Sequence, residues 1–88
     1  MKTFNDLKDG DTIYLLEGSH LTKCIFHSVR RDCPNSIVFQ LPHLDRNSIF
    51  YRMDLNVPYF NAYGDVYCTA SIEGLIKLIT DICYACKM

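Results

Sequence analysis

The residues of this chain with the most chemical potential are its five cysteines and three histidines. Cys83 and Cys86 have the Cys-x-x-Cys spacing that supplies half of a tetrahedral zinc site. The sequence contains no second pair at this spacing, although other ligands are available in Cys24, Cys33, Cys68, His20, His27 and His43. Both cysteines also fall on the apolar side of a predicted helix, where small thiols pack as core residues. We expect packing, with no metal and no cofactor; a structural metal site is the alternative.

The sequence gives little support for catalysis by a thiol. The Cys-x-x-Cys pair lies near the C-terminal end of the predicted helix, where the negative end of the helix dipole disfavours a thiolate. Cys24 with His27, or Cys33 with His43, could form a nucleophilic pair. Residues three apart on a strand point to opposite faces, so Cys24 and His27 should not meet. Because no motif places a nucleophile beside a base, we predict that the protein is not an enzyme.

The sequence gives more support for a binding function, which we place in the stretch from Asp54 to Gly64. This stretch has no clear period and contains three aromatic residues within five positions, Tyr59, Phe60 and Tyr63. Exposed aromatic clusters make good recognition surfaces because they add contact area at low entropic cost. We predict that these three residues bind a protein partner. The alternative is that the rings fill a small core of their own.

The last part of the chain predicts an amphipathic helix that follows a short strand. Ser71 or Thr69 is placed to cap this helix, and Glu73 lies in its first turn, where the dipole favours a negative charge. Its apolar side is wide enough for two seams. The seam that we expect in the core contains Ile72, Leu75, Ile76, Ile79, Ile82, Cys83 and Cys86. The seam predicted to form a homodimer contact contains Leu75, Leu78, Ile82 and Ala85.

The residues before the helix predict short strands rich in β-formers. Gly18-Ser19 is a two-residue hairpin turn between the first two strands, which we therefore expect to pair. The stretch Asp54 to Gly64 leaves a further strand or turn open. The predicted strands are Asp11–Glu17, Leu21–Arg30, Ser36–Leu41, Ser48–Met53 and Asp65–Cys68.

The segment Leu7-Lys8-Asp9-Gly10-Asp11-Thr12-Ile13-Tyr14, followed by short strands, resembles the entry into the first strand of SH3-like small barrels. The chain is also similar to short bacterial and phage-borne proteins that add a strand and a terminal helix to such a barrel. It departs from peptide-binding SH3 domains in having no tryptophan, so the resemblance does not imply recognition of proline motifs. We predict an α+β fold, either an SH3-like barrel or a bent antiparallel sheet of about five strands with one C-terminal helix.

The amino-acid composition narrows the range of possible functions. Eighty-eight residues, 49% of them hydrophobic, predict a single folded domain over residues 1–88. A net charge of −1 without a basic stripe makes nucleic acid an unlikely partner. The sequence shows no signal peptide and no apolar run near the length of a membrane span, so we expect a cytoplasmic protein with reduced cysteines and no membrane partner. The expected function is a small interaction module that binds a protein partner or itself, with a metal-binding or thiol-bearing domain as the alternative.

Overall fold

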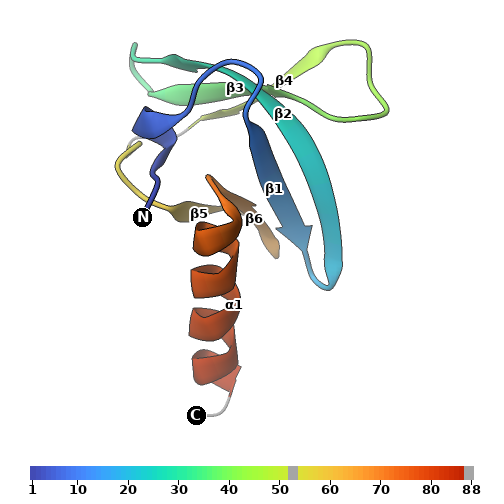
Figure 1. Ribbon diagram of the computed structural model, residues 1–88, viewed down its shortest axis with the longest axis vertical. Helices are drawn as coiled ribbons and strands as arrows, with labels where there is room; N and C mark the ends of the chain where they lie inside the picture. The colour runs from blue at the N-terminus through green and yellow to red at the C-terminus, as the bar shows by residue number, and fades with distance from the viewer. Residues whose placement is uncertain (52–53, 87–88) are drawn as a thin grey trace.

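The computed structural model describes residues 1–51 and 54–86, and it shows an α+β fold with one antiparallel sheet and a C-terminal helix (Figure 1). Within these residues the order across the six-stranded sheet is β4-β3-β2-β1-β6-β5. The elements are the 3-10 turn η1 (Phe4–Asp6), the strands β1 (Thr12–Glu17), β2 (His20–Arg30), β3 (Ser36–Gln40), β4 (Asn47–Tyr51), β5 (Tyr59–Tyr63) and β6 (Val66–Thr69), and the helix α1 (Ile72–Cys86).

Two tight turns set the register of the hairpins β1–β2 and β5–β6. Glu17 is opposite His20, so Gly18 and Ser19 are the two turn residues, as the sequence predicted. Gly18 has φ of 59° and Gly64, in the second turn, has φ of 53°. This left-handed conformation is accessible to glycine without a steric penalty, which explains why each turn contains one.

The sheet contains one strand more than the sequence predicted. The additional strand is β5, which lies inside the stretch from Asp54 to Gly64 and pairs with β6. Its register shifts between Asn61 and Tyr63 because Ala62 forms a bulge. A bulge breaks the two-residue alternation of a strand, so the pattern in this stretch had no clear period.

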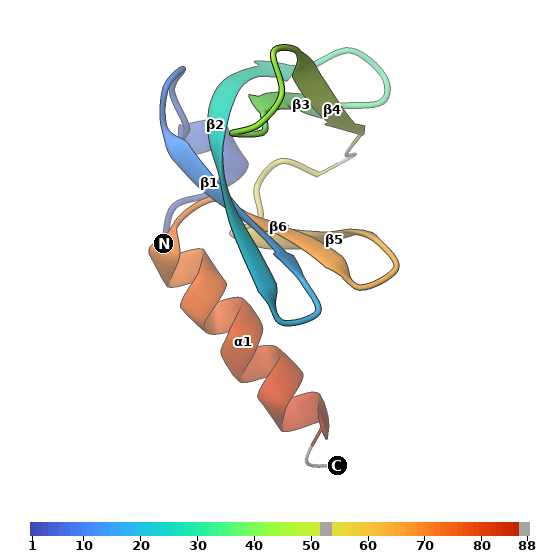
Figure 2. The ribbon, with the colours of Figure 1, turned by 90° about the vertical axis from the view of Figure 1, so that its right-hand side faces the viewer.

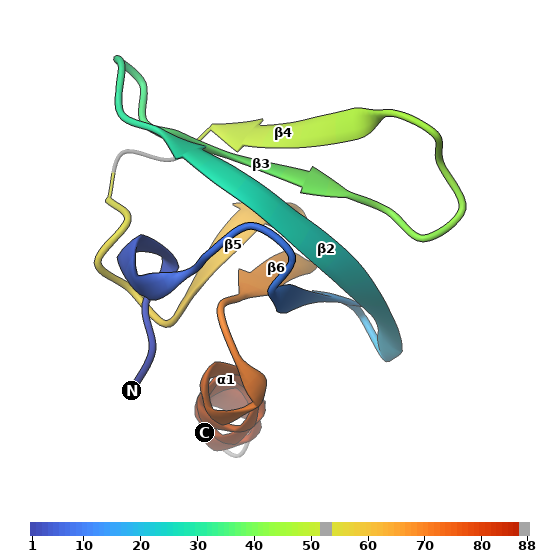
Figure 3. The same cartoon turned by 45° about the horizontal axis from the view of Figure 1, so that its top comes forward.

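The sheet bends so strongly that its two halves face each other. β2 pairs with β1 through its N-terminal half and with β3 from Ile25 to its C-terminal end, and a bulge at His27 interrupts the pairing with β3. The β3–β4 half therefore crosses over the β6–β5 half (Figures 2 and 3). The hydrophobic core fills the space between the halves and is formed by Phe4, Ile13, Cys24, Phe26, Ile37, Phe39, Leu55, Phe60, Cys68 and Ala70.

The edge strands β4 and β5 approach each other through their side chains. The ring centroids of Phe50 on β4 and Phe60 on β5 are 6.0 Å apart, and the ring of Phe4 lies 5.1 Å from Phe60. Phe4 is held in place by η1, in which Thr3 donates two hydrogen bonds to the carboxylate of Asp6. These hydrogen bonds lower the pKa of Asp6. The turn η1 therefore closes one end of the core.

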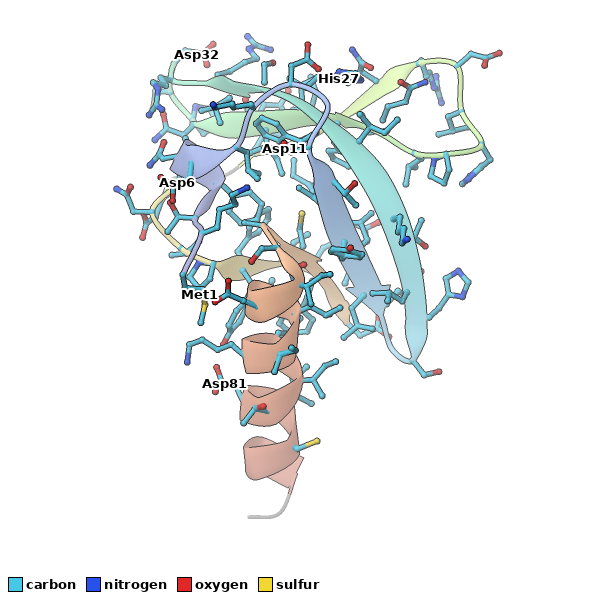
Figure 4. All side chains as sticks on the ribbon, in the orientation of Figure 1. Met1, Asp6, Asp11, His27, Asp32 and Asp81 are labelled. Carbon is cyan, nitrogen blue, oxygen red and sulfur yellow. The ribbon has the colours of Figure 1, made fainter. Side chains whose placement is uncertain are left out.

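His27 ties the bulge of β2 to the loop that precedes β1. Figure 4 shows His27 beside the loop that precedes β1. Its Nδ1 lies 2.8 Å from Asp9 Oδ1, and its Nε2 lies 3.3 Å from Gln40 Oε1. The hydrogen bond with Asp9, and then the one with Gln40, raise the pKa of His27. A histidine whose pKa is higher in the folded state stabilises the fold fully below its unfolded pKa. This stabilisation is lost as the pH rises through the folded pKa.

Replacing His27 by glutamine is therefore expected to lower the melting temperature more at about pH 5 than at about pH 8. Thermal unfolding of the two proteins across this range would measure the difference. His20→Gln is a matched control, because His20 lies at the tip of the β1–β2 hairpin and is exposed. A gap between wild type and His27→Gln that does not change with pH would show that the ion pair with Asp9 contributes nothing to folding.

Candidate binding surfaces

The helix α1 lies on the outer face of the bent sheet, where it contacts β5 and β6. Its C-terminal half extends beyond the sheet (Figure 1). Ser71 Oγ accepts the Gly74 N–H at 3.1 Å and caps the first turn, as the sequence predicted. Farther along, the Tyr59 hydroxyl donates to the carboxylate of Asp81, which lowers the pKa of Asp81 and raises that of Tyr59. The hydrogen bond between Tyr59 and Asp81 joins the helix to β5.

The side of α1 that faces the sheet matches the predicted core seam only at Leu75 and, in part, at Ile82. Leu75 and Leu78 are buried, with exposed fractions of 9% and 1%. Ile72, Ile76 and Ile79, which were expected in the core, are exposed to 58%, 60% and 45%. Cys83 is also exposed, so this part of the core prediction is wrong. Cys86 lies outside the residues whose side chains the structure describes.

Gly74 explains the orientation of the helix. A Cβ atom at this position would lie 2.6 Å from the carbonyl oxygen of Pro58, so the backbones of α1 and of the segment before β5 approach as closely as a glycine allows. Leu78 follows Gly74 by four residues and lies on the same face of the helix. The close approach at Gly74 therefore turns Leu78 toward the sheet and leaves the neighbouring seam outside.

The seam that was predicted to form a homodimer contact is largely used inside the molecule. Leu75 and Leu78 pack against the sheet, and Ile82 is half-buried. Ala85 lies outside the residues whose side chains are described. Self-association through α1 stays a prediction, and the exposed residues Ile72, Ile76, Ile79 and Cys83, here called the isoleucine stripe, are the surface that could carry it.

The outer face of the β1–β2 hairpin also exposes apolar side chains. Leu16 on β1 is directly opposite Leu21 on β2, so both side chains point to the same face of the sheet. Ile25 lies four residues after Leu21 and shares this face. Leu21 and Ile25 are exposed to 46% and 44%, while Leu16 is half-buried.

An outer groove runs between α1 and this face of the hairpin. A hollow of about 300 Å³ near the hairpin tip is lined in part by Leu16, Ile79 and Cys83. A second hollow of about 270 Å³, lined in part by Tyr14 and Ile72, lies toward the start of the helix. The isoleucine stripe therefore borders a groove that is apolar near the hairpin tip. Toward the start of the helix the groove is also lined by the charged residues Lys2, Asp11 and Glu73.

The three aromatic residues predicted to bind a partner do not form one exposed cluster. Phe60 is only 3% exposed, because its ring lies in the core between Phe4 and Phe50. The Tyr59 side chain is on the opposite face of β5, where its hydroxyl binds Asp81 on α1. Tyr63 alone is well exposed, at 64%. The predicted partner surface is reduced to this tyrosine.

Tyr63 lies at the edge of a separate cavity. The cavity has a volume of about 450 Å³ and lies on the concave face of the bent sheet, away from α1. All six strands contribute to it, so it has no local sequence signature. One signal was present in the sequence: Glu17 follows Ile13 and Leu15 at two-residue spacing, which places a carboxylate on the face that forms the core.

The described cysteines fall into two classes. Burial raises the pKa of Cys24 to about 11, and burial, followed by the neighbouring Cys24, raises the pKa of Cys68. Cys33 and Cys83 are exposed thiols. Cys24 points into the core while His27 binds Asp9 and Gln40, so these two residues do not form a nucleophilic pair. Among the residues that the structure describes, no cluster of three or more His, Cys, Asp or Glu side chains is placed to hold a metal ion.

The fold and these surfaces define an α+β protein with a partly apolar groove on the outer face of its sheet and a cavity on the concave face. No helix in residues 1–51 and 54–86 is long and apolar enough to span a bilayer. Comparison of the chain with protein-family models, with curated proteins and with solved structures finds no match.

Proposed function

We propose that this protein is a small, non-enzymatic interaction module that forms a homodimer through the isoleucine stripe and the outer groove. The observation that carries the proposal is the exposure of Ile72, Ile76 and Ile79 along one side of α1. Fully burying an isoleucine side chain is worth about 1.5–3 kcal/mol. A row of half-exposed isoleucines beside a partly apolar groove is therefore a surface that gains free energy when a partner covers it.

A second copy of the chain fits this surface because the stripe is self-complementary. Its residues follow one another at intervals of four, three and four positions, a pattern that is symmetric about the midpoint between Ile76 and Ile79. Two such helices packed antiparallel about a two-fold axis would place Ile76 opposite Ile79, and Ile72 opposite Cys83. Isologous contacts of this kind are the usual way in which soluble proteins form dimers.

The helix alone is too small for a stable interface. With 15 residues, α1 has a footprint of roughly 22 Å by 10 Å, whereas a standard interface buries about 800 Å² of accessible surface on each partner. The exposed Leu21 and Ile25 on the hairpin widen the apolar surface beside the stripe. In the proposed dimer each α1 therefore contacts both the partner's helix and the partner's β1–β2 hairpin.

Analytical ultracentrifugation of the full chain over a range of concentrations tests this proposal. Wild-type protein is expected to dimerise, and Ile76→Glu is expected to raise the dissociation constant at least about tenfold, because two glutamates would enter an apolar contact. Ile49→Glu is the matched control: Ile49 is an exposed isoleucine on the edge strand β4, away from α1. A wild-type monomer at every accessible concentration, or equal effects of the two substitutions, would overturn the proposal.

Disulfide cross-linking tests the antiparallel arrangement. In a protein with Cys33→Ser and Cys86→Ser, the added substitution Ile72→Cys is expected to yield a covalent dimer upon mild oxidation, because the new thiol would face Cys83 of the second copy. The same protein without Ile72→Cys is expected to stay largely unlinked. Cross-linking through Cys83 alone would instead indicate parallel helices.

The same proposal includes two further points: the protein has no enzymatic activity, and it is located in the cytoplasm. Burial keeps the Cys24 thiol protonated, and His27 is already engaged by Asp9 and Gln40, which argues against a thiol-based reaction at these residues. Cys24, Cys33, Cys68 and Cys83 are all free thiols, as is usual in a reducing compartment.

We also propose that the fold is related to SH3-like small barrels. The resemblance of the segment from Leu7 to Tyr14 supports it, together with the strong bend of the antiparallel sheet. The sheet differs from such a barrel in two respects: its edges at β4 and β5 are open, and it has a sixth strand.

A further inference from the structure

The concave cavity has the size of a ligand site and a location separate from the proposed dimer contact. Its volume of about 450 Å³ falls within the range of about 300–1,000 Å³ that small-molecule sites occupy. It lies on the face of β1 and β2 opposite to the outer groove, since Leu15 lines the cavity and Leu16 lines the groove. The residues that line the cavity come from the β1–β2, β3–β4 and β5–β6 hairpins.

The chemistry of the cavity changes from its wall to its rim. Leu15, Phe39 and Phe50 supply an apolar wall that includes two aromatic rings. The ring of Tyr63 lies 6.3 Å from that of Phe50, so a third aromatic side chain borders the opening. At the rim, Glu17 supplies the only carboxylate among the lining residues. A ligand would therefore meet aromatic and aliphatic groups inside, together with the Glu17 carboxylate and the imidazole rings of His20 and His43.

Glu17 has no partner within the described part of the chain. Its carboxylate takes part in none of the hydrogen bonds or ion pairs of residues 1–51 and 54–86, and the lining contains no lysine or arginine. The two histidines of the lining, His20 and His43, do not combine with Glu17 into a cluster that could hold a metal ion. The carboxylate is thus free to pair with a positive group that a ligand brings.

We propose that this cavity binds an organic cation carried on an apolar stem: an ammonium or guanidinium group that pairs with Glu17 while its stem lies against Phe39, Phe50 and Tyr63. Aromatic faces attract a cation through the ring quadrupole, and they also pack against an apolar stem. An anion of the same shape would be repelled by Glu17, and a neutral analogue would gain neither the ion pair nor the cation–π attraction. The ligand is a free amine or the lysine or arginine side chain of a partner protein, because both present this chemistry.

Three phenyl compounds of matched shape test the charge requirement. Backbone amide NMR signals would be followed during titration with 2-phenylethylammonium, the neutral 2-phenylethanol and the anion 3-phenylpropionate. We expect saturable shifts at Thr22, Ser48 and Tyr63, which line the cavity, with the cation alone or at least about tenfold more tightly than with the other two. No saturable shift with the cation up to about 10 mM, or equal binding of the three compounds, would overturn the proposal.

A pair of isosteric substitutions tests the role of Glu17. Glu17→Gln is expected to weaken binding of 2-phenylethylammonium at least about tenfold, because the amide keeps the shape but loses the charge. Glu73→Gln on α1 is the matched control, which should leave binding unchanged, since Glu73 does not line the cavity. Unchanged binding by Glu17→Gln would overturn the proposal. Repeating the titration with Ile76→Glu separates this site from dimerisation, because the cavity does not include the isoleucine stripe.

A capped tripeptide with a central lysine, Ac-Phe-Lys-Phe-amide, distinguishes the two sources of the cation. Binding at least about tenfold tighter than that of the free amine would assign the site to a partner protein. Binding weaker than that of the free amine would assign it to a small metabolite. Either result requires the same loss with Glu17→Gln, and a peptide that binds equally well to this variant would count against the proposed ion pair.

Discussion

Leu78→Ala is expected to lower the free energy of unfolding by about 2–5 kcal/mol, the range observed when a buried leucine is truncated. Leu78 is 1% exposed, and it lies on the face of α1 that packs against the sheet. Truncation would remove the contacts of the side chain and leave a cavity beside β5 and β6. Chemical denaturation followed by circular dichroism would measure the change.

The adjacent residue provides the control for this prediction. Ile79 is 45% exposed, so Ile79→Ala is expected to cost less than about 1 kcal/mol in the monomer. Both substitutions should be introduced into the Ile76→Glu protein, because dimerisation would otherwise stabilise the folded state and obscure the comparison. If Ile79→Ala cost more than Leu78→Ala, the helix would present the face predicted from the sequence, and the proposed dimer surface would be lost.

Gly74→Ala is expected to destabilise the protein by about 1–3 kcal/mol, even though alanine is the better helix former. In an open helix this substitution would stabilise by about 1 kcal/mol. Here the new Cβ atom would lie 2.6 Å from the carbonyl oxygen of Pro58, a backbone atom that also accepts the Ala70 N–H at 2.9 Å. The carbonyl cannot move away without losing this hydrogen bond, so α1 would have to shift.

Equilibrium denaturation of Gly74→Ala beside Glu73→Ala would test the contact. Glu73 is exposed in the same turn of α1, so its replacement by alanine leaves the approach to Pro58 unchanged. A stabilised Gly74→Ala protein would show that the helix does not approach Pro58 closely. A destabilised protein that also loses the protection of its α1 amides from hydrogen exchange would support the described docking.

The two proposed binding surfaces lie on opposite faces of β1 and β2. Neighbouring residues Leu15 and Leu16 point to the cavity and to the outer groove, respectively. A homodimer formed through the groove would leave both cavities open to solvent. The proposed module would therefore present two cation-binding cavities in a fixed relation, which suits a bivalent partner.

Local signals in the sequence determined most of the secondary structure. Glycine at the left-handed position marked the hairpin turn at Gly18-Ser19, and alternating β-formers marked five of the strands. Periodic apolar residues and Ser71 as cap marked α1. Each of these signals acts through residues only a few positions apart, which is why the sequence contains them. β5 was missed because the bulge at Ala62 interrupts its alternation.

The tertiary structure decided which surfaces these elements present. Helical periodicity identified two adjacent apolar seams on α1, but the contact between Gly74 and Pro58 selected the seam with Leu78 for the core and exposed the isoleucine stripe. The bend of the sheet likewise brought Glu17 and Tyr63 to one cavity from strands far apart in the chain. A pattern along the chain reports which side chains share a face. What lies opposite that face depends on contacts between distant residues, and these arise only when the sheet bends and the helix docks.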